Sequence, residues 1–126
     1  MRFVLDTTFI IDHLRGVPAA IAWLERAMAT GDPVYVTEIV VCEAWTGANS
    51  DDDRWLRGLL EPLEVVAPGP EQARIAGRWR VMARAGGRAL GLGDALIAAT
   101  AHSLDAAVLT RNTRDFRLTP VRVETY

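Results

Sequence analysis

The sequence contains no lysine and a single cysteine. One thiol, Cys42, excludes both an intrachain disulfide and a metal site built from several thiolates. Cys42 lies within the apolar run of residues 39–42, so we expect it to fill the hydrophobic core. All 14 basic residues are arginine, whose planar guanidinium is suited to phosphate contacts.

Long hydrophobic runs are also missing. No apolar stretch approaches the ~20 residues needed to cross a bilayer, and the first residues do not form a basic leader ahead of an apolar segment. We therefore expect a cytoplasmic protein with no membrane partner. A length of 126 residues with 50% hydrophobic content predicts one domain, residues 1–126, with one sizeable core.

The charge is small and unevenly placed. A formal net charge of −2 argues against a protein that holds nucleic acid by bulk electrostatics alone. Eight of the arginines nevertheless fall in two groups, which are Arg74, Arg78, Arg80, Arg84 and Arg88, then Arg111, Arg114 and Arg117. Such a group either contacts phosphates or forms the solvated face of a helix, and the sequence alone leaves both interpretations open.

Asp6 is the polar break between two apolar runs near the start of the chain. The first run, residues 3–5, is typical of a strand buried on both faces, and Thr8 is a candidate helix start. The carboxylate would then lie at the carboxyl end of a central strand, where open parallel sheets bind ligands. Two structural alternatives are that Asp6 caps the next helix or lies in an exposed turn.

Short β-rich stretches alternate with helical ones along the rest of the chain. The expected strands are residues 3–5, 34–36, 63–66, 106–109 and 121–123. The expected helices are about residues 8–14, 18–29, 38–46, a segment after 51–53, 71–85 and 94–101. This alternation predicts a three-layer α/β fold with a mostly parallel sheet of four to five strands.

Two further acids lie on apolar helices. Glu43 is flanked by apolar residues, and an acid is costly to bury without a partner, so we favour a site residue over a narrow polar stripe. Asp94 lies in the first turn of its helix, where the helix dipole alone would favour an acid. Glycines just before Asp94 would also let other backbone approach its carboxylate closely.

Asn112 and Asp115 follow the fourth expected strand, as Asp6 follows the first. The ends of parallel strands meet at one edge, to which the helices of Glu43 and Asp94 can return. Two carboxylates about 4 Å apart repel each other by about 4 kcal/mol at an effective dielectric near 20, so such a cluster needs a cation. All-oxygen ligands without cysteine or a histidine pair favour Mg²⁺ or Mn²⁺.

An acidic site with a hard cation is suited to phosphoryl transfer. The cation polarises a phosphodiester and lowers the pKa of an attacking water, while arginines near the rim hold the substrate backbone. His13 and His102 are better interpreted as isolated helix residues, and no serine or cysteine nucleophile arrangement is evident. Metal-activated water is therefore the expected nucleophile.

Four segments resemble the motifs of PIN-domain ribonucleases. They are VLDTTFIID at 4–12, TEIVVCEA at 37–44, GDALIAA at 93–99 and LTRNTRDF at 109–116. The short length and the last two segments look most like the VapC toxins of bacterial and archaeal toxin-antitoxin pairs. The resemblance spans the whole chain, and it gains its strength from four motifs in the right order.

The resemblance implies a PIN-like sheet in 3-2-1-4-5 order and a Mg²⁺- or Mn²⁺-dependent endoribonuclease. It also implies a homodimer that cleaves RNA and is neutralised by a VapB-type antitoxin. Carried over by position, Asp6, Glu43 and Asp94 would be the metal-binding acids. The fourth acidic position falls on Asn112, which brings no charge, and Asp115 one helical turn later would substitute, so we keep both.

The resemblance also suggests which residues support the site or contact RNA. Thr7 or Thr8 would support the first acid. The residues expected to contact the substrate are Thr7, Thr8, Arg84, Arg88 and Arg111.

Three other classes of protein share single features with this chain. A haloacid-dehalogenase-type phosphatase needs a second aspartate two residues after the first, where this chain has Thr8. A receiver domain needs a lysine near its last strand, and the chain has none. The remaining alternative is a catalytically silent PIN-like module that binds RNA or protein, which predicts that the site acids are lost.

Overall fold

The computed structural model describes residues 1–126 as five strands and seven helices. The strands are β1 (Phe3–Leu5), β2 (Val34–Thr37), β3 (Glu64–Val66), β4 (Ala107–Leu109) and β5 (Val123–Glu124). The helices are α1 (Thr7–Leu14), α2 (Pro18–Thr30), α3 (Glu38–Gly47), α4 (Asp53–Leu60), α5 (Pro70–Ala85), α6 (Leu92–Ser103) and α7 (Thr113–Phe116).

All five strands form one parallel sheet in the order β3-β2-β1-β4-β5. The expected α/β fold class and strand order are therefore confirmed. β1 is central, and its residue Leu5 is level with Val36 on one neighbour and Leu109 on the other. The residues that follow these three strands consequently start from one edge of the sheet.

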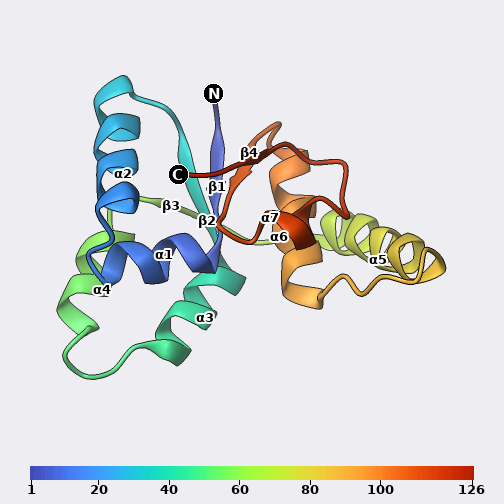
Figure 1. Ribbon diagram of the computed structural model, residues 1–126, viewed down its shortest axis with the longest axis horizontal. Coiled ribbons are helices and arrows are strands. Elements are labelled where there is room, and N and C mark those ends of the chain that lie inside the picture. Colours follow the sequence, from blue (N-terminus) through green and yellow to red (C-terminus); the bar gives the residue numbers. More distant parts are fainter.

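The helices lie on both sides of the sheet (Figure 1). Helices α1 to α4 lie on one side and α5 to α7 on the other, with α5 packed on α6 rather than on the strands. α3 also contacts α1 and α6 near the carboxyl ends of the strands. This arrangement brings the start of α6 close to α3, although about fifty residues separate them in sequence.

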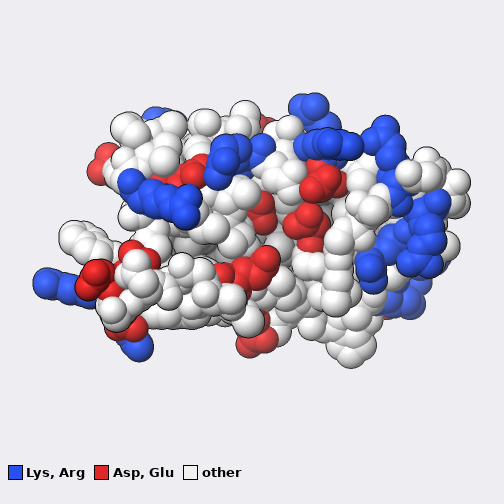
Figure 2. All heavy atoms as spheres, turned by 60° about the horizontal axis from the view of Figure 1, so that its bottom comes forward, with Lys and Arg blue, Asp and Glu red and all other residues white.

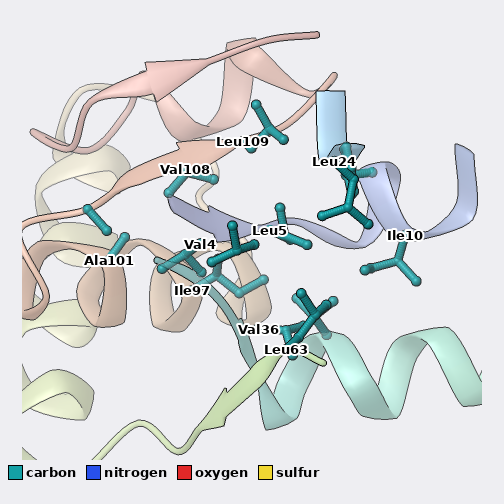
Figure 3. Close-up of a cluster of buried hydrophobic side chains, with 14 of the residues drawn as sticks. Val4, Leu5, Ile10, Leu24, Val36, Leu63, Ile97, Ala101, Val108 and Leu109 are labelled. Carbon is teal, nitrogen blue, oxygen red and sulfur yellow. The ribbon is translucent and has the colours of Figure 1, made fainter. Parts of the chain in front are cut away.

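The main core fills the space between the sheet and both helix layers. Val4, Val108 and Leu109 point into it from the central strands, and Ile97 and Ala101 come from α6 (Figure 3). These residues are fully buried, which fits strands that read as continuous apolar runs. α6 is buried along most of its length, as its small and apolar composition predicts.

Two expectations from the sequence are wrong in detail. Cys42 is exposed rather than part of the core, because α3 turns Val40 and Ala44 inward and leaves the cysteine on the opposite face. The last strand is Val123–Glu124 instead of residues 121–123, since Val123 is the residue level with Val108 of β4. No helix of the structure is both long and apolar enough to cross a membrane.

Candidate active site

Asp6 lies at the end of the central strand, and its carboxylate is fixed by two threonines. It is 4% exposed, and its backbone N–H continues the sheet by donating to the Leu109 carbonyl at 3.0 Å. Oδ2 accepts hydrogen bonds from Thr110 Oγ1 at 2.7 Å and Thr8 Oγ1 at 3.1 Å. Asp6 occupies the N-cap position of α1, but its side chain makes no capping hydrogen bond. The capping alternative is therefore excluded.

The other carboxylate oxygen of Asp6 has a different environment. No donor in the protein reaches Oδ1, yet the structure has no fully buried side-chain oxygen without a hydrogen-bond partner. Oδ1 must therefore reach solvent, although the residue as a whole is buried. A carboxylate held by one oxygen and open at the other is arranged to accept a ligand from outside.

Glu43 lies on α3 and is held by the first residue of α1. Thr7 Oγ1 donates to Glu43 Oε1 at 3.0 Å, and Thr37 caps the helix by accepting a hydrogen bond from the Val40 N–H. The side chain is exposed rather than buried, so the cost of burial does not arise. Gly93 comes close, since a Cβ built there would lie 3.8 Å from Glu43 Oε1.

Asp94 joins these acids from the first turn of α6. Burial and, after it, the charges of Asp6, Asp115 and Glu43 together raise its pKa to about 6. Like charges have this effect when they lie near one another. Four acids therefore lie near one another at the carboxyl edge of the sheet: Asp6 after β1, Glu43 on α3, Asp94 on α6 and Asp115 on α7.

Asn112 and Asp115 are brought together rather than being alternatives. Asn112 Nδ2 donates to Asp115 Oδ2 at 2.9 Å, and the Asn112 N–H donates to Thr110 Oγ1 at 2.8 Å. The carboxylate of Asp115 acts on the pKa of Asp94, whereas the amide of Asn112 orients Asp115. Asp115 thus places a carboxylate near Asp94 one helical turn after Asn112.

Thr110 is the contributor that sequence reasoning missed. It is fully buried and contacts both Asp6 and the backbone of Asn112 through one hydroxyl. The signal was a hydroxyl residue directly after an apolar strand. The role of Thr110 depends on the pairing of β4 with β1, because that register places Thr110 beside Asp6.

Arg111 was expected to contact the substrate; its side chain is 62% exposed, and its guanidinium is paired with Asp12. Nε and Nη2 donate to the two carboxylate oxygens of Asp12 at 2.8 and 3.0 Å. A bidentate pair of this kind is among the stronger charge-assisted contacts in proteins. The structure therefore gives Arg111 a role within the fold.

Arg84 and Arg88 are exposed at the end of α5 and just after it. Figure 2 shows the face that carries the carboxyl edge of the sheet. Acidic side chains gather in its middle, and arginines gather over the α5 side and along one border. This face therefore combines an acidic centre with arginines on the α5 side and along one border.

The donor set fits a hard divalent cation. The converging groups are all carboxylates, and neither histidine joins them: His13 packs beside Phe9, and His102 beside Trp79. No three acidic, histidine or cysteine side chains are gathered closely enough to enclose an ion by themselves. Burial is the largest cause of the raised pKa of Asp94, and the repulsion from the other three acids adds to it; a bound cation would relieve that repulsion.

Fold and site together define a PIN domain. The family model for the PIN domain matches residues 3–121. The chain therefore belongs to the PIN-domain family.

Individual relatives define the branch of the family. Ribonuclease VapC19 from Mycobacterium tuberculosis is 34% identical over 117 residues, which is 93% of this chain and 94% of the relative. A chain in the crystal structure of DNA-bound VapBC from Salmonella typhimurium has a TM-score of 0.85 at 26% identity. That match covers 99% of this chain and 98% of the other.

A further structure, VapBC2 from Rickettsia felis bound to a fragment of promoter DNA, supports the fold alone. It has a TM-score of 0.89 at 22% identity and covers 100% of this chain and 99% of the other. Within the PIN-domain family, this chain is a member of the VapC group.

Proposed function

We propose that this chain is a metal-dependent endoribonuclease toxin that a VapB-type antitoxin neutralises. The observation that carries the proposal is the group of four carboxylates near the end of the central strand, where burial and the charges of the other three raise the pKa of Asp94 to about 6. The names of the relatives agree with it, since they are VapC ribonucleases and VapBC complexes. The target would be an RNA of the cytoplasm.

Each acid has a distinct place in this proposal. Asp6, Glu43, Asp94 and Asp115 would hold Mg²⁺ or Mn²⁺, with Asp6 contributing its free oxygen, Oδ1. When bound, the cation supplies Lewis-acid polarisation of the phosphodiester and lowers the pKa of an attacking water. The carboxylates are oriented by hydrogen bonds from Thr7, Thr8, Thr110 and Asn112. In this proposal these four residues support the acids instead of contacting the RNA.

Asp94 is also the group most suited to hold a proton. With a pKa of about 6, its carboxyl is mostly ionised at neutral pH, but it takes up a proton at a higher pH than ordinary aspartates do.

Arg84 and Arg88 are exposed on the surface and would pair with backbone phosphates of the RNA. The outward placement of these arginines supports this part of the proposal.

The antitoxin would occupy a hollow beside the acidic site. A hollow of about 650 Å³ lies between α1, α2 and α4, with Leu14, Ile21, Leu24 and Leu59 among its lining. Trp55 stands at this surface and is 73% exposed, which is unusual for so large an apolar side chain. An apolar segment of the antitoxin fits this surface, and α1 runs from it to Asp6.

The homodimer would use a different surface. Val81 and Met82 on α5 and Leu92 at the start of α6 are 62%, 69% and 60% exposed. α5 and α6 lie on the opposite side of the sheet from α1, α2 and α4, which line the hollow (Figure 1). Covering them with a second copy would leave that hollow accessible.

The test is cleavage by the purified, antitoxin-free chain. A panel of structured RNAs, including tRNAs, would be incubated with Mg²⁺, with Mn²⁺ and with EDTA. Asp6→Asn keeps the shape of the side chain but removes its charge, and we expect it to lower cleavage more than about 100-fold, because even orienting groups around a metal cost 10- to 100-fold. The matched control is Asp51→Asn, which changes an exposed acid in the loop before α4.

Two outcomes would separate the proposal from its alternative. Cleavage that needs a divalent cation and fails in Asp6→Asn alone supports the nuclease. Tight RNA binding without cleavage, under either metal, would instead favour a catalytically silent binding module.

A further inference from the structure

Three side chains from distant parts of the chain meet beside the acidic site without joining it. Asp12 lies on α1, Arg111 follows β4 and Tyr126 follows β5; we call them the Asp12 cluster. Asp12 Oδ2 accepts from Arg111 Nε at 2.8 Å and from the Tyr126 hydroxyl at 2.6 Å, while Oδ1 accepts from Arg111 Nη2 at 3.0 Å. Asp12 is 8% exposed, so these bonds replace its hydration.

The Asp12 cluster is joined to the site through backbone groups. The N–H of Arg111 donates to Thr8 Oγ1 at 3.1 Å, and the same hydroxyl donates to Asp6 Oδ2. The N–H of Thr110 donates to the carbonyl of Glu124 at 3.0 Å, two residues before Tyr126. Both hydroxyls that orient Asp6 therefore depend on how the segment after β4 is seated.

Tyr126 is itself held in place. Its ring packs edge-on against Phe9, with centroids 5.0 Å apart, and Phe9 is fully buried. Burial, followed by the hydrogen bond with Asp12, raises the pKa of Tyr126 to about 12, so the hydroxyl keeps its proton at neutral pH. It consequently acts as a donor to Asp12 throughout the physiological range.

We propose that Tyr126 and Asp12 are positioning residues for RNA cleavage. They seat Arg111 and the segment 110–115 against α1, so that Thr8 and Thr110 meet on one oxygen of Asp6. The inference rests on the proposed function. It identifies residues outside the acids that affect the rate of cleavage. In this proposal the guanidinium of Arg111 positions the segment 110–115 and does not bind phosphate.

The test compares variants that remove single groups from the Asp12 cluster. Tyr126→Phe keeps the ring on Phe9 and removes only the hydroxyl. The control is Tyr35→Phe, on β2, whose hydroxyl makes no hydrogen bond in the structure. The readouts are kcat and KM for RNA cleavage, and amide hydrogen exchange across residues 110–115.

We expect Tyr126→Phe to lower kcat roughly 10-fold with KM unchanged, since groups that orient metal-site ligands act on this scale. Amide exchange across residues 110–115 should become faster, while exchange in α2 stays the same. Tyr126→Phe combined with Asp12→Asn should be no worse than Asp12→Asn alone, because the tyrosine acts through the aspartate.

Specific results would overturn this inference. A kcat for Tyr126→Phe equal to that of Tyr35→Phe would sink it, and so would unchanged exchange across residues 110–115. A loss of kcat in which exchange rises equally throughout the chain would show a general stability effect instead. If the unmodified chain cleaves no RNA with any metal, the proposed function fails, whereas the exchange comparison still tests the seating of this segment.

Discussion

Both hydroxyls that contact Asp6 reach the same oxygen, and this asymmetry explains how a buried carboxylate serves as a ligand. Thr8 and Thr110 fix Oδ2, so the side chain has one orientation and Oδ1 faces outward. A carboxylate free to rotate would have to be ordered when the cation binds. The two threonines already order the carboxylate when the chain folds, as groups next to metal ligands commonly do.

Replacing Thr110 with valine tests this role at nearly constant volume. The change removes the donor to Asp6 and the acceptor of the Asn112 N–H, so we expect a loss of about 1–3 kcal/mol in the free energy of unfolding. Cleavage should fall roughly 10-fold. Thr100→Val is the control, since that buried hydroxyl bonds to the Leu96 carbonyl within α6. Equal loss of activity in both variants would contradict the assignment.

The raised pKa of Asp94 predicts how the free energy of unfolding depends on pH in the absence of metal. Its pKa rises from 3.8 to about 6 on folding, so the folded chain binds the proton more tightly than the unfolded chain does. This contribution to stability is fully present below pH 3.8 and is lost as the pH rises through about 6. We expect the free energy of unfolding, measured with urea in EDTA, to fall less over this pH window for Asp94→Asn than for the unmodified chain.

Added metal supplies the control for that measurement. Because a cation binds the ionised carboxylates, Mg²⁺ or Mn²⁺ should raise the unfolding temperature more at pH 7.5 than at pH 5. An Asp94→Asn variant with the same pH profile as the unmodified chain would show that the carboxyl titrates normally.

Individual residues also show where sequence reasoning reaches its limit. The strand before Asp6 and the helix around Asp94 are visible as local apolar patterns, so both acids could be placed from the sequence. Arg111 pairs with a residue 99 positions away, and no local pattern indicates that contact. Cys42 was assigned to the core from its neighbours, although the helical period turns it outward.

At the scale of elements, α3 has the task of presenting Glu43. Thr37 ends β2 and at the same time caps α3, by accepting a hydrogen bond from the Val40 N–H at 3.3 Å. The cap fixes the first turn of the helix, and Glu43 lies one turn further along. One residue thus joins the sheet edge to the helix that carries an acid of the site.

Thr37→Ala should therefore destabilise the chain by about 1 kcal/mol, the usual cost of losing such a cap. Urea unfolding measures the difference, and Thr37→Ser should recover most of it because serine also offers a hydroxyl oxygen. If serine and alanine were equally destabilising, the lost methyl contacts of this fully buried residue would be the cause instead of the cap.

Elements were more predictable than their exact ends. The helices at 71–85 and around 94–101 follow directly from apolar spacing and glycine or proline boundaries, and α5 and α6 confirm them. The short strands are harder to predict, since a run of three residues shows almost no periodicity of apolar and polar residues. Their order came from the resemblance, and the end of β5 was set by pairing with β4, which no local pattern encodes.

At the scale of the whole molecule, the charges are arranged so that a chain with a net charge of −2 can still bind a polyanion. Acids are concentrated in the centre of one face, and arginines lie on its α5 side and along one border (Figure 2). A divalent cation would neutralise part of the centre and leave the arginines to contact the phosphates of the RNA. Binding should accordingly depend on both the cation and the ionic strength.

The arginine part of this arrangement can be tested alone. Replacing Arg84 and Arg88 together with alanine removes two exposed cations without touching the acids. Each phosphate contact with single-stranded RNA contributes about 0.7 to the slope of log affinity against log salt, so the slope should decrease by about 1.4. RNA binding would be measured in Ca²⁺ over a range of KCl concentrations, with Arg26→Ala on α2 as a control for an exposed arginine elsewhere. A slope unchanged from that of the unmodified chain would mean that these arginines form only a solvated face of α5, and the phosphate contacts would then have to be sought along the border near α7.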